Sequence, residues 1–264
     1  MNNKASELGL TNTHFETPHG LDSDQHYTTA YELALLSNYA LNNKFFAKIV
    51  GTKDYTISIN GYPKQLSNTN ELLGNLDGVY GIKTGFTNGA NRCLVTACKR
   101  NDMDIICVVL GADTKKFRTQ DSIKLINYVF DNFKSVDVNN LVNKSFENWK
   151  IKNLSKIVLN KSASNNLDLY ISPSSDSPIS SENACIPVRK DLVDDITITV
   201  NCPLFFDTPI PLNSKLGFID VCVSDYCSLE YGIYNGLEVK HKSWNDYFFD
   251  FWKNYSDILN YQFI

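Results

Sequence analysis

Short apolar runs separated by turn residues characterise the stretch from residue 54 to residue 111. Residues 54–59 alternate between polar and apolar side chains, and the alternation resumes after Asn60-Gly61, which predicts a β-hairpin. Three more runs follow with short connections between them, and they predict an antiparallel meander. These runs occupy residues 78–84, 93–98 and 104–111.

An amphipathic helix is predicted directly after these strands, over residues 119–134. Its apolar side chains recur every three or four positions, at Ile123, Ile126, Val129, Phe130 and Phe133. We expect this face to cover the sheet. A second helix is predicted to begin at the capping box Thr29-Ala30-Tyr31-Glu32 and to end near Asn42.

Residues 1–9 have the pattern of the last turns of a helix. Ala5 and Leu8 are its apolar positions, and Gly9 suits the stop. Because no capping residue precedes this helix, we interpret the chain as the C-terminal portion of a longer protein. A turn-rich connection over residues 10–28 follows.

The pattern changes after Lys134. Residues 135–239 show short apolar or alternating runs without a helical period, separated by polar clusters such as Ser172–Ser181. This profile predicts a small β-sandwich-like domain over 135–241, with its boundary near residue 135. The fold class expected for the whole chain is α+β, in which helices cover an antiparallel sheet and a small all-β domain and a terminal helix follow.

The last segment, 242–264, is predicted to be a helix with one aromatic-rich face and one polar face. The apolar face consists of Trp244, Tyr247, Phe248, Phe251, Trp252, Tyr255, Ile258 and Leu259. This arrangement is typical of a helix that lies in a membrane surface. The alternative is a helix packed on its own domain. The acidic polar face favours that alternative, because anionic lipids attract lysine rather than aspartate.

Composition and charge narrow the classes of function. The chain has 264 residues, of which 43% are hydrophobic and 20% charged, and a formal net charge of −4, which is typical of a globular protein. It has no block of basic residues, so a nucleic-acid partner is not expected. No apolar stretch is long enough to span a membrane, and the first residues do not form a secretion signal. We expect neither a metal nor a cofactor, because no ligand cluster or phosphate-binding loop is present.

The seven cysteines are an odd number and include no C-x-x-C pair, which excludes a dense disulfide framework. We expect most of them to be free and buried, as at Cys107 within the apolar run 105–110. Cys222 and Cys227 flank a predicted turn and can face each other across two strands. A disulfide between them is the less favoured alternative.

Candidate chemistry is concentrated in Lys83-Thr84-Gly85, at the end of a predicted strand. An exposed strand edge can pair with an extended peptide. Lys83 supplies a cation, the Thr84 hydroxyl can bind a carboxylate, and Gly85 leaves room for a ligand. The N–H of Phe86 can donate to a developing oxyanion, which stabilises a transition state by roughly 3–4 kcal/mol.

The sequence around this triplet resembles the D-alanyl-D-alanine carboxypeptidases, the low-molecular-mass penicillin-binding proteins. The segments that carry the resemblance are Leu8–Phe15, Pro18–Asp22, Tyr27–Ala30, Gly81–Thr87 and Arg92–Val95. The resemblance implies that residues 1–134 are part of a penicillin-binding catalytic domain with a β-lactamase/transpeptidase-like fold. A looser resemblance over 135–239 implies the β-rich domain that follows it in the family.

The family uses three motifs, Ser-x-x-Lys, Ser-x-Asn and Lys-Thr-Gly. No serine in the chain has a lysine three positions later, and every Ser-x-Asn triplet lies in the wrong context. These triplets are Ser58–Asn60, Ser164–Asn166, Ser181–Asn183 and Ser243–Asn245. We therefore expect the nucleophile to lie upstream of Met1. The chain alone should be inactive, because losing a serine nucleophile costs about a millionfold in rate.

The resemblance implies a serine-type D-Ala-D-Ala carboxypeptidase that trims peptidoglycan stem peptides through an acyl-enzyme. It assigns catalysis to Lys83, Thr84, Gly85 and Phe86, and substrate binding to Lys83, Thr84, Thr87 and Arg118. Arg118 would lie near the terminal carboxylate, and the alternative is a solvated arginine at a helix start. β-Lactams are the implied ligands of the full-length protein, and the bacterial cell envelope, outside the cytoplasm, is the implied location. His14 and His19 are interpreted as structural.

Two other functions stay open. One is a non-catalytic cell-wall or membrane-associated scaffold, in which the second domain and the aromatic helix do the binding. The other is a β-lactamase-like hydrolase, which shares Lys-Thr-Gly but normally lacks a trailing β-domain.

Overall fold

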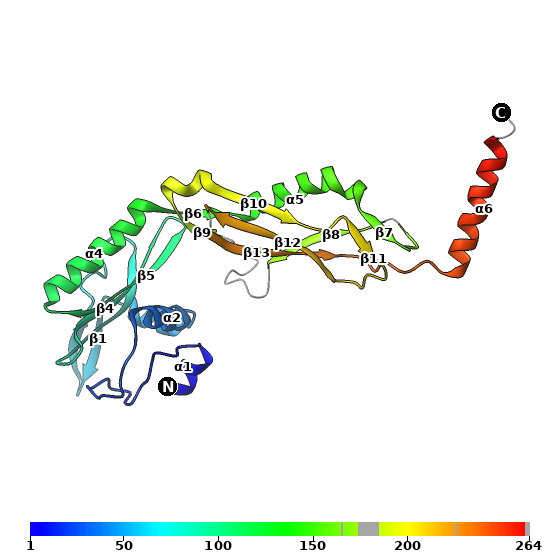
Figure 1. Cartoon of the computed structure of the whole chain (residues 1–264). Coiled ribbons are helices and arrows are strands. Elements are labelled where there is room, and N and C mark those ends of the chain that lie inside the picture. Colours follow the sequence, from blue (N-terminus) through cyan, green and yellow to red (C-terminus); the bar gives the residue numbers. More distant parts are fainter. Residues whose placement is uncertain (165, 174–184, 225, 262–264) are drawn as a thin grey trace. The chain divides into compact units, whose positions relative to one another are not determined.

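A computed structural model describes residues 1–164, 166–173, 185–224 and 226–261 of the chain. The chain divides into two compact units, Met1–Lys134 and Ser135–Ile264 (Figure 1). Each unit has its own hydrophobic core and is described by itself.

The first unit is built on the antiparallel meander that the alternating pattern predicts. β3 (Val79–Thr87), β4 (Asn91–Arg100) and β5 (Met103–Ala112) pair in chain order. The predicted hairpin consists of β1 (Asp54–Ile59) and β2 (Tyr62–Ser67). Its turn residues Asn60 and Gly61 both have positive φ, as a type I′ turn requires. The predictions of the meander and of the hairpin are confirmed.

Helices pack on the β3–β4–β5 sheet through two separate cores. Because successive side chains of a strand point to opposite faces, Leu94 of β4 joins Ile126 of α4 (Lys115–Asn132), whereas Ala97 joins Leu41 of α2 (Ala30–Leu41). α4 covers the sheet as predicted. It begins earlier than residue 119, because the Thr114 side chain caps it by accepting a hydrogen bond from the N–H of Phe117 at 3.1 Å.

Of the three N-terminal helices, the second and the third have side-chain caps and the first has none. α1 (Asn2–Glu7) ends before Gly9, whose φ is 70°. Thr29 caps α2 as predicted, but the capping box is not reciprocal. The carboxylate of Glu32 instead accepts hydrogen bonds from the N–H of Asn12 at 2.8 Å and from the hydroxyl of Thr13, which ties the preceding connection to α2. α3 (Lys44–Val50), which the sequence pattern did not predict, is a short helix capped by the side chain of Asn43.

An antiparallel four-stranded sheet forms the centre of the second unit. Its order is β10 (Ile196–Asn201), β12 (Lys215–Val223), β13 (Tyr226–Asn235) and β8 (Leu169–Pro173). α5 (Asn139–Asn153) packs against this sheet, so the expectation of no helix between 135 and 239 is wrong. Val138, Val142 and Phe146 recur every four residues and are buried with Ile219. Trp149 also packs against this core, and asparagines and lysines occupy many of the other positions.

Short elements complete the second unit. β7 (Val158–Asn160) pairs in parallel with β11 (Phe205–Asp207), and β6 (Phe133–Asp137) pairs with β9 (Cys185–Arg189). Short 3-10 helices span Leu154–Lys156 and Lys190–Asp195. The triplet Ser181–Asn183, the middle residue of Ser164–Asn166 and most of the polar cluster Ser172–Ser181 lie outside the described residues.

Cys222 is disulfide-bonded, and its register partner across β12 and β13 is Cys227. The preference for a free thiol is therefore wrong at Cys222, because the antiparallel register places these two positions side by side, within the short span that a disulfide requires. Cys98 and Cys107 are free and buried, as expected. Burial raises the pKa of the Cys107 thiol to about 11.

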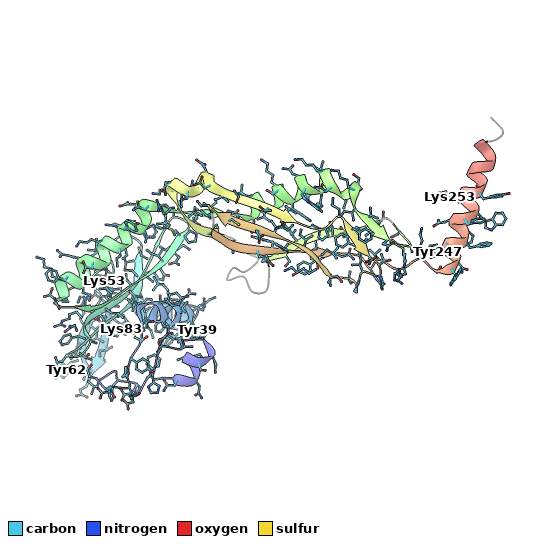
Figure 2. The ribbon with its side chains drawn as sticks, in the orientation of Figure 1. Tyr39, Lys53, Tyr62, Lys83, Tyr247 and Lys253 are labelled. Carbon is cyan, nitrogen blue, oxygen red and sulfur yellow. The ribbon has the colours of Figure 1, made fainter. Side chains whose placement is uncertain are left out.

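The C-terminal helix, α6 (Trp244–Tyr261), exposes its aromatic face. Trp244 is 91% exposed, and the other described aromatic side chains of the helix are between 46% and 70% exposed. Figure 2 shows these side chains standing out from the helix, with Tyr247 labelled. This exposure argues against the alternative in which the stripe packs on its own domain. The side chains of Ile258 and Leu259 lie outside the described set. No described helix has both the length and the hydropathy needed to cross a bilayer.

Candidate functional site

The outer edge of β3 borders a groove. Among the described strands β3 pairs only with β4, so no described strand covers its other edge. A groove of about 740 Å³ lies there. Its walls include Lys83 to Thr87 of β3 and, from the connection before α2, Phe15, His19 to Asp22 and His26 to Thr28. The groove therefore joins two segments that are far apart in the sequence.

Five of the six predicted site residues line this groove, and they are Lys83, Thr84, Gly85, Phe86 and Thr87. The side chain of Lys83 is exposed on β3 (Figure 2). A Cβ at Gly85 would meet only Cys93 Cβ, at an ordinary 3.7 Å, so packing within the protein does not require glycine there. The Phe86 ring is 52% exposed and stacks on the guanidinium of Arg92, whose Cζ lies 3.7 Å from the ring centre. The strand thus presents a cation, a gap and an aromatic surface along one edge.

Asp22 holds the turn that follows β3. Its carboxylate accepts a hydrogen bond from the N–H of Gly89 at 3.0 Å. Hydrogen bonds from the Thr87 hydroxyl and from the Gly89 N–H lower the pKa of the Asp22 carboxyl. The Thr87 hydroxyl also accepts a hydrogen bond from the N–H of Ala90 at 2.9 Å. Thr87 therefore supports the turn through its hydroxyl. No role for Asp22 was predicted, although it lies in Pro18–Asp22, one of the segments that carry the family resemblance.

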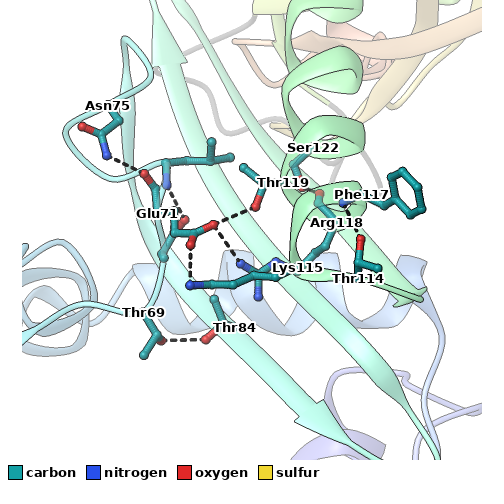
Figure 3. A network of polar contacts seen from close by, with 12 residues as sticks. Thr69, Glu71, Asn75, Thr84, Thr114, Lys115, Phe117, Arg118, Thr119 and Ser122 are labelled. Carbon is teal, nitrogen blue, oxygen red and sulfur yellow. Dashed lines mark hydrogen bonds and ion pairs between the residues drawn. The ribbon is translucent and has the colours of Figure 1, made fainter.

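Arg118 does not line the groove. It lies on α4 and is only 3% exposed, so the alternative of a solvated arginine at a helix start is wrong. Its Nη2 is 3.6 Å from Oε2 of Glu71, and its Nε and Nη2 have no hydrogen-bond partner among the described residues. Burial lowers the pKa of the Arg118 guanidinium, although the charge of Glu71 opposes this shift. Glu71 also pairs with Lys115 and accepts a hydrogen bond from the Thr119 hydroxyl at 3.0 Å (Figure 3).

A second polar contact links the groove to the loop that contains Glu71. The hydroxyls of Thr69 and Thr84 lie 2.6 Å apart (Figure 3). Thr69 and Glu71, both in the connection between β2 and β3, thus reach Thr84 and Arg118 respectively. Sequence reasoning missed both residues, because no local pattern marks a loop residue whose partner lies on another element.

The histidines of the connection before α2 are close to the groove. His19 and His26 belong to its lining, and the ring of His26 packs edge-on against Phe15. His14 pairs with Tyr27 through two backbone hydrogen bonds, which hold the ends of this connection together. Among the residues that the structure describes, the lining also contains Cys93 but no serine.

The first unit is similar in sequence to known proteins. Residues 1–114 match the family model described as D-alanyl-D-alanine carboxypeptidase. DacF of Bacillus subtilis, a D-alanyl-D-alanine carboxypeptidase, is 38% identical over 136 residues, which cover 51% of this chain and 35% of DacF. DacC of Escherichia coli, named likewise, is 41% identical over 140 residues, which cover 52% of this chain and 34% of DacC. Residues 1–114 are therefore similar to the D-alanyl-D-alanine carboxypeptidase family.

Solved structures share the fold over most of the chain. Penicillin binding protein 5 from Haemophilus influenzae superposes on 91% of this chain and 64% of its own, with a TM-score of 0.68 and 22% identity. The D-alanyl-D-alanine carboxypeptidase DacD from Francisella tularensis superposes on 91% of this chain and 67% of its own, with a TM-score of 0.56 and 20% identity. The α+β fold class is therefore confirmed. The matched segments span about a third of the length of DacF and DacC.

Proposed function

We propose that the groove is part of the active site of a serine-type D-Ala-D-Ala carboxypeptidase that trims the terminal D-alanine from peptidoglycan stem peptides. The observation that carries this proposal is the Lys-Thr-Gly strand with an uncovered edge beside a groove, inside the segment that matches the family. An extended peptide can pair with such an edge. Its terminal carboxylate can then accept a hydrogen bond from Thr84.

In this reaction a serine hydroxyl attacks the carbonyl carbon of the penultimate D-alanine. The C–N bond breaks, the terminal D-alanine leaves with the proton on its amine, and an ester joins the peptide to the serine. Water then hydrolyses the ester and restores the hydroxyl. Lys83 stabilises negative charge in the groove, and the N–H of Phe86 donates to the oxyanion, a contribution of roughly 3–4 kcal/mol. β-Lactams acylate the same serine.

The attacking serine has to come from residues other than those of the groove. The described residues of the lining include no serine, and Ser-x-x-Lys does not occur in the 264 residues. We expect this chain to bind a D-Ala-D-Ala peptide without turning it over. Turnover is expected of a form of the enzyme that includes the Ser-x-x-Lys motif.

Two measurements test this proposal. An acylated Lys-D-Ala-D-Ala tripeptide should bind to the chain in a calorimetric titration, and Thr84→Val should weaken binding about tenfold, as loss of a hydrogen bond to a charged group predicts. Thr56→Val, a change on β1 outside the groove lining, is the control. Fluorescent penicillin should not label the chain covalently. Covalent labelling would contradict the expected inactivity, and a Ser-x-x-Lys-containing form that releases no D-alanine would overturn the proposed function.

We also propose that the protein works outside the cytoplasm, at a membrane surface. The disulfide at Cys222 supports an oxidising compartment, because cytosolic proteins keep their thiols reduced. The aromatic face of α6 supports the membrane, since it is exposed along its described length and suits the interface between headgroups and acyl chains. This location fits an enzyme that acts on the cell wall.

A further inference from the structure

In the loop of residues 68–71, between β2 and β3, side chains that anchor the loop alternate with side chains that contact Thr84 and Arg118. Asn68 and Asn70 turn their side chains to the protein. Asn68 Nδ2 donates to the carbonyl oxygens of Val50 at 3.2 Å and Thr52 at 3.0 Å, and Asn70 Nδ2 donates to the carbonyl oxygen of Gly81 at 3.0 Å. Asn70 is 2% exposed. Its Oδ1 also accepts a hydrogen bond from the N–H of Leu72, so this loop is fixed at both of its asparagines.

The intervening residues of this loop contact Thr84, which lines the groove, and Arg118, which is buried outside the described lining. The Thr69 hydroxyl contacts the Thr84 hydroxyl, and the Glu71 carboxylate contacts the guanidinium of Arg118 (Figure 3). We propose that Thr69 and Glu71 are positioning residues, which set the orientation of Thr84 and Arg118 for the terminal carboxylate of the substrate. This proposal rests on the proposed carboxypeptidase function.

Thr69 can fix the direction of the Thr84 proton. A hydroxyl donates one hydrogen bond and accepts up to two. If Thr69 donates across the 2.6 Å contact, the Thr84 oxygen is the acceptor and the Thr84 proton is free for a carboxylate. A variant that cannot donate at position 69 leaves the Thr84 proton free to turn toward other acceptors. Serine at position 69 keeps the donor, whereas valine removes it without changing the shape of the side chain.

Glu71 gives Arg118 its counter-charge. A buried guanidinium without a partner charge is unfavourable, and Arg118 has no hydrogen bond at two of its nitrogens among the described residues. Glu71 is held in turn by Lys115 and by the hydroxyl of Thr119. The carboxylate is therefore fixed from the α4 side and holds the guanidinium in one place. Its removal lets Arg118 move away from the position that a substrate carboxylate would meet.

The test uses the Ser-x-x-Lys-containing form of the enzyme and two peptides, one that ends in D-Ala-D-Ala with a free carboxylate and one that ends in the carboxamide. Thr69→Val and Glu71→Ala should each raise KM for the free acid about tenfold, with kcat changed less than twofold. The carboxamide should react equally with the wild type and with both variants. Thr69→Ser should restore the wild-type KM. Glu230→Ala, which breaks an exposed ion pair with Lys215 in the second unit, is the control.

The outcomes separate the two proposals. If the wild type prefers the free acid but Thr69→Val and Glu71→Ala do not alter that preference, the positioning roles are wrong and the carboxypeptidase function stands. Equal losses on both peptides would also overturn the positioning roles, since they indicate general damage to the site. Glu71→Gln and a thermal unfolding scan identify a folding defect of Glu71→Ala. A wild type that neither binds nor cleaves the free acid would overturn both proposals.

Discussion

The Asp22 carboxylate and the Gly89 backbone are in direct contact, although 67 positions separate them in the sequence. Besides the hydrogen bond of 3.0 Å, a Cβ at Gly89 would lie 3.1 Å from Oδ1 of Asp22, so a larger residue there would require the carboxylate to shift. Asp22 belongs to the connection before α2, and Gly89 belongs to the turn after β3. The contact thus joins the two walls of the groove.

Loss of the Asp22 carboxylate should loosen the turn after β3. In Asp22→Ala we expect amide exchange at Gly89 and Ala90 to become at least tenfold faster, because the acceptor of the Gly89 N–H and the partner of Thr87 are both removed. Hydrogen exchange followed by mass spectrometry measures this change. Asp22→Asn keeps an oxygen acceptor and should restore much of the protection. Gly89→Ala requires the Asp22 carboxylate to shift and should weaken the protection less than Asp22→Ala does. Unchanged exchange in both variants would show that the turn is stable without Asp22.

The same contact predicts a pH dependence. Hydrogen bonds from Thr87 and Gly89 lower the pKa of Asp22, so folding favours the ionised carboxylate. The stabilisation is therefore fully present above the pKa of aspartate in an unfolded chain, about 3.9. It is lost as the pH falls through the lower folded value. Protection of the Gly89 amide, relative to its intrinsic exchange rate, should be constant from pH 7 to pH 5 and should disappear only below about pH 4. Loss of protection near pH 6 would contradict the assignment of this dependence to Asp22.

Local patterns predicted most of the first unit, because its strands and helices bury side chains at regular intervals. Leu94 and Ala97 obey the two-residue period of a strand between two cores, and Ile126 obeys the helical period. The candidate residues Lys83 to Thr87 could be proposed from sequence because they are consecutive on one strand. The helix α5 was missed although Val142, Phe146 and Trp149 recur at helical spacing, because five asparagines interrupt the pattern between them and around them.

The supporting contacts of the site could not be predicted in this way. Asp22 and Gly89, or Glu71 and Arg118, meet only after the chain has folded, and nothing in their neighbours specifies the pairing. Arg118 has the residue type expected for a carboxylate ligand. Its burial depends on packing of α4 against the sheet, which no single-sequence pattern reveals.

Alkylation of the free cysteines can report whether a peptide occupies the groove. Cys93 is partly exposed and lines the groove, whereas Cys185 is exposed in the second unit. Burial raises the pKa of Cys107 and of Cys202 to about 11, so these thiols should resist alkylation at pH 8. A saturating D-Ala-D-Ala peptide should slow iodoacetamide alkylation of Cys93 at least fivefold and leave Cys185 unchanged, as peptide mapping by mass spectrometry can show. Equal rates at Cys93 with and without peptide would place the ligand elsewhere.

The exposed aromatic face of α6 should bind lipid vesicles. Phe248 and Trp252 are 60% and 52% exposed, and burying each side chain in the interface contributes about 1.5–3 kcal/mol. Phe248→Asp together with Trp252→Asp should therefore weaken partitioning into phosphatidylcholine vesicles at least a hundredfold in a flotation assay. Asn245→Asp, on the polar face, is the matched control. Because residues 242–264 contain two lysines and three aspartates, phosphatidylglycerol should not strengthen binding. If the chain without residues 242–264 floats as well as the intact chain, α6 is not the membrane contact.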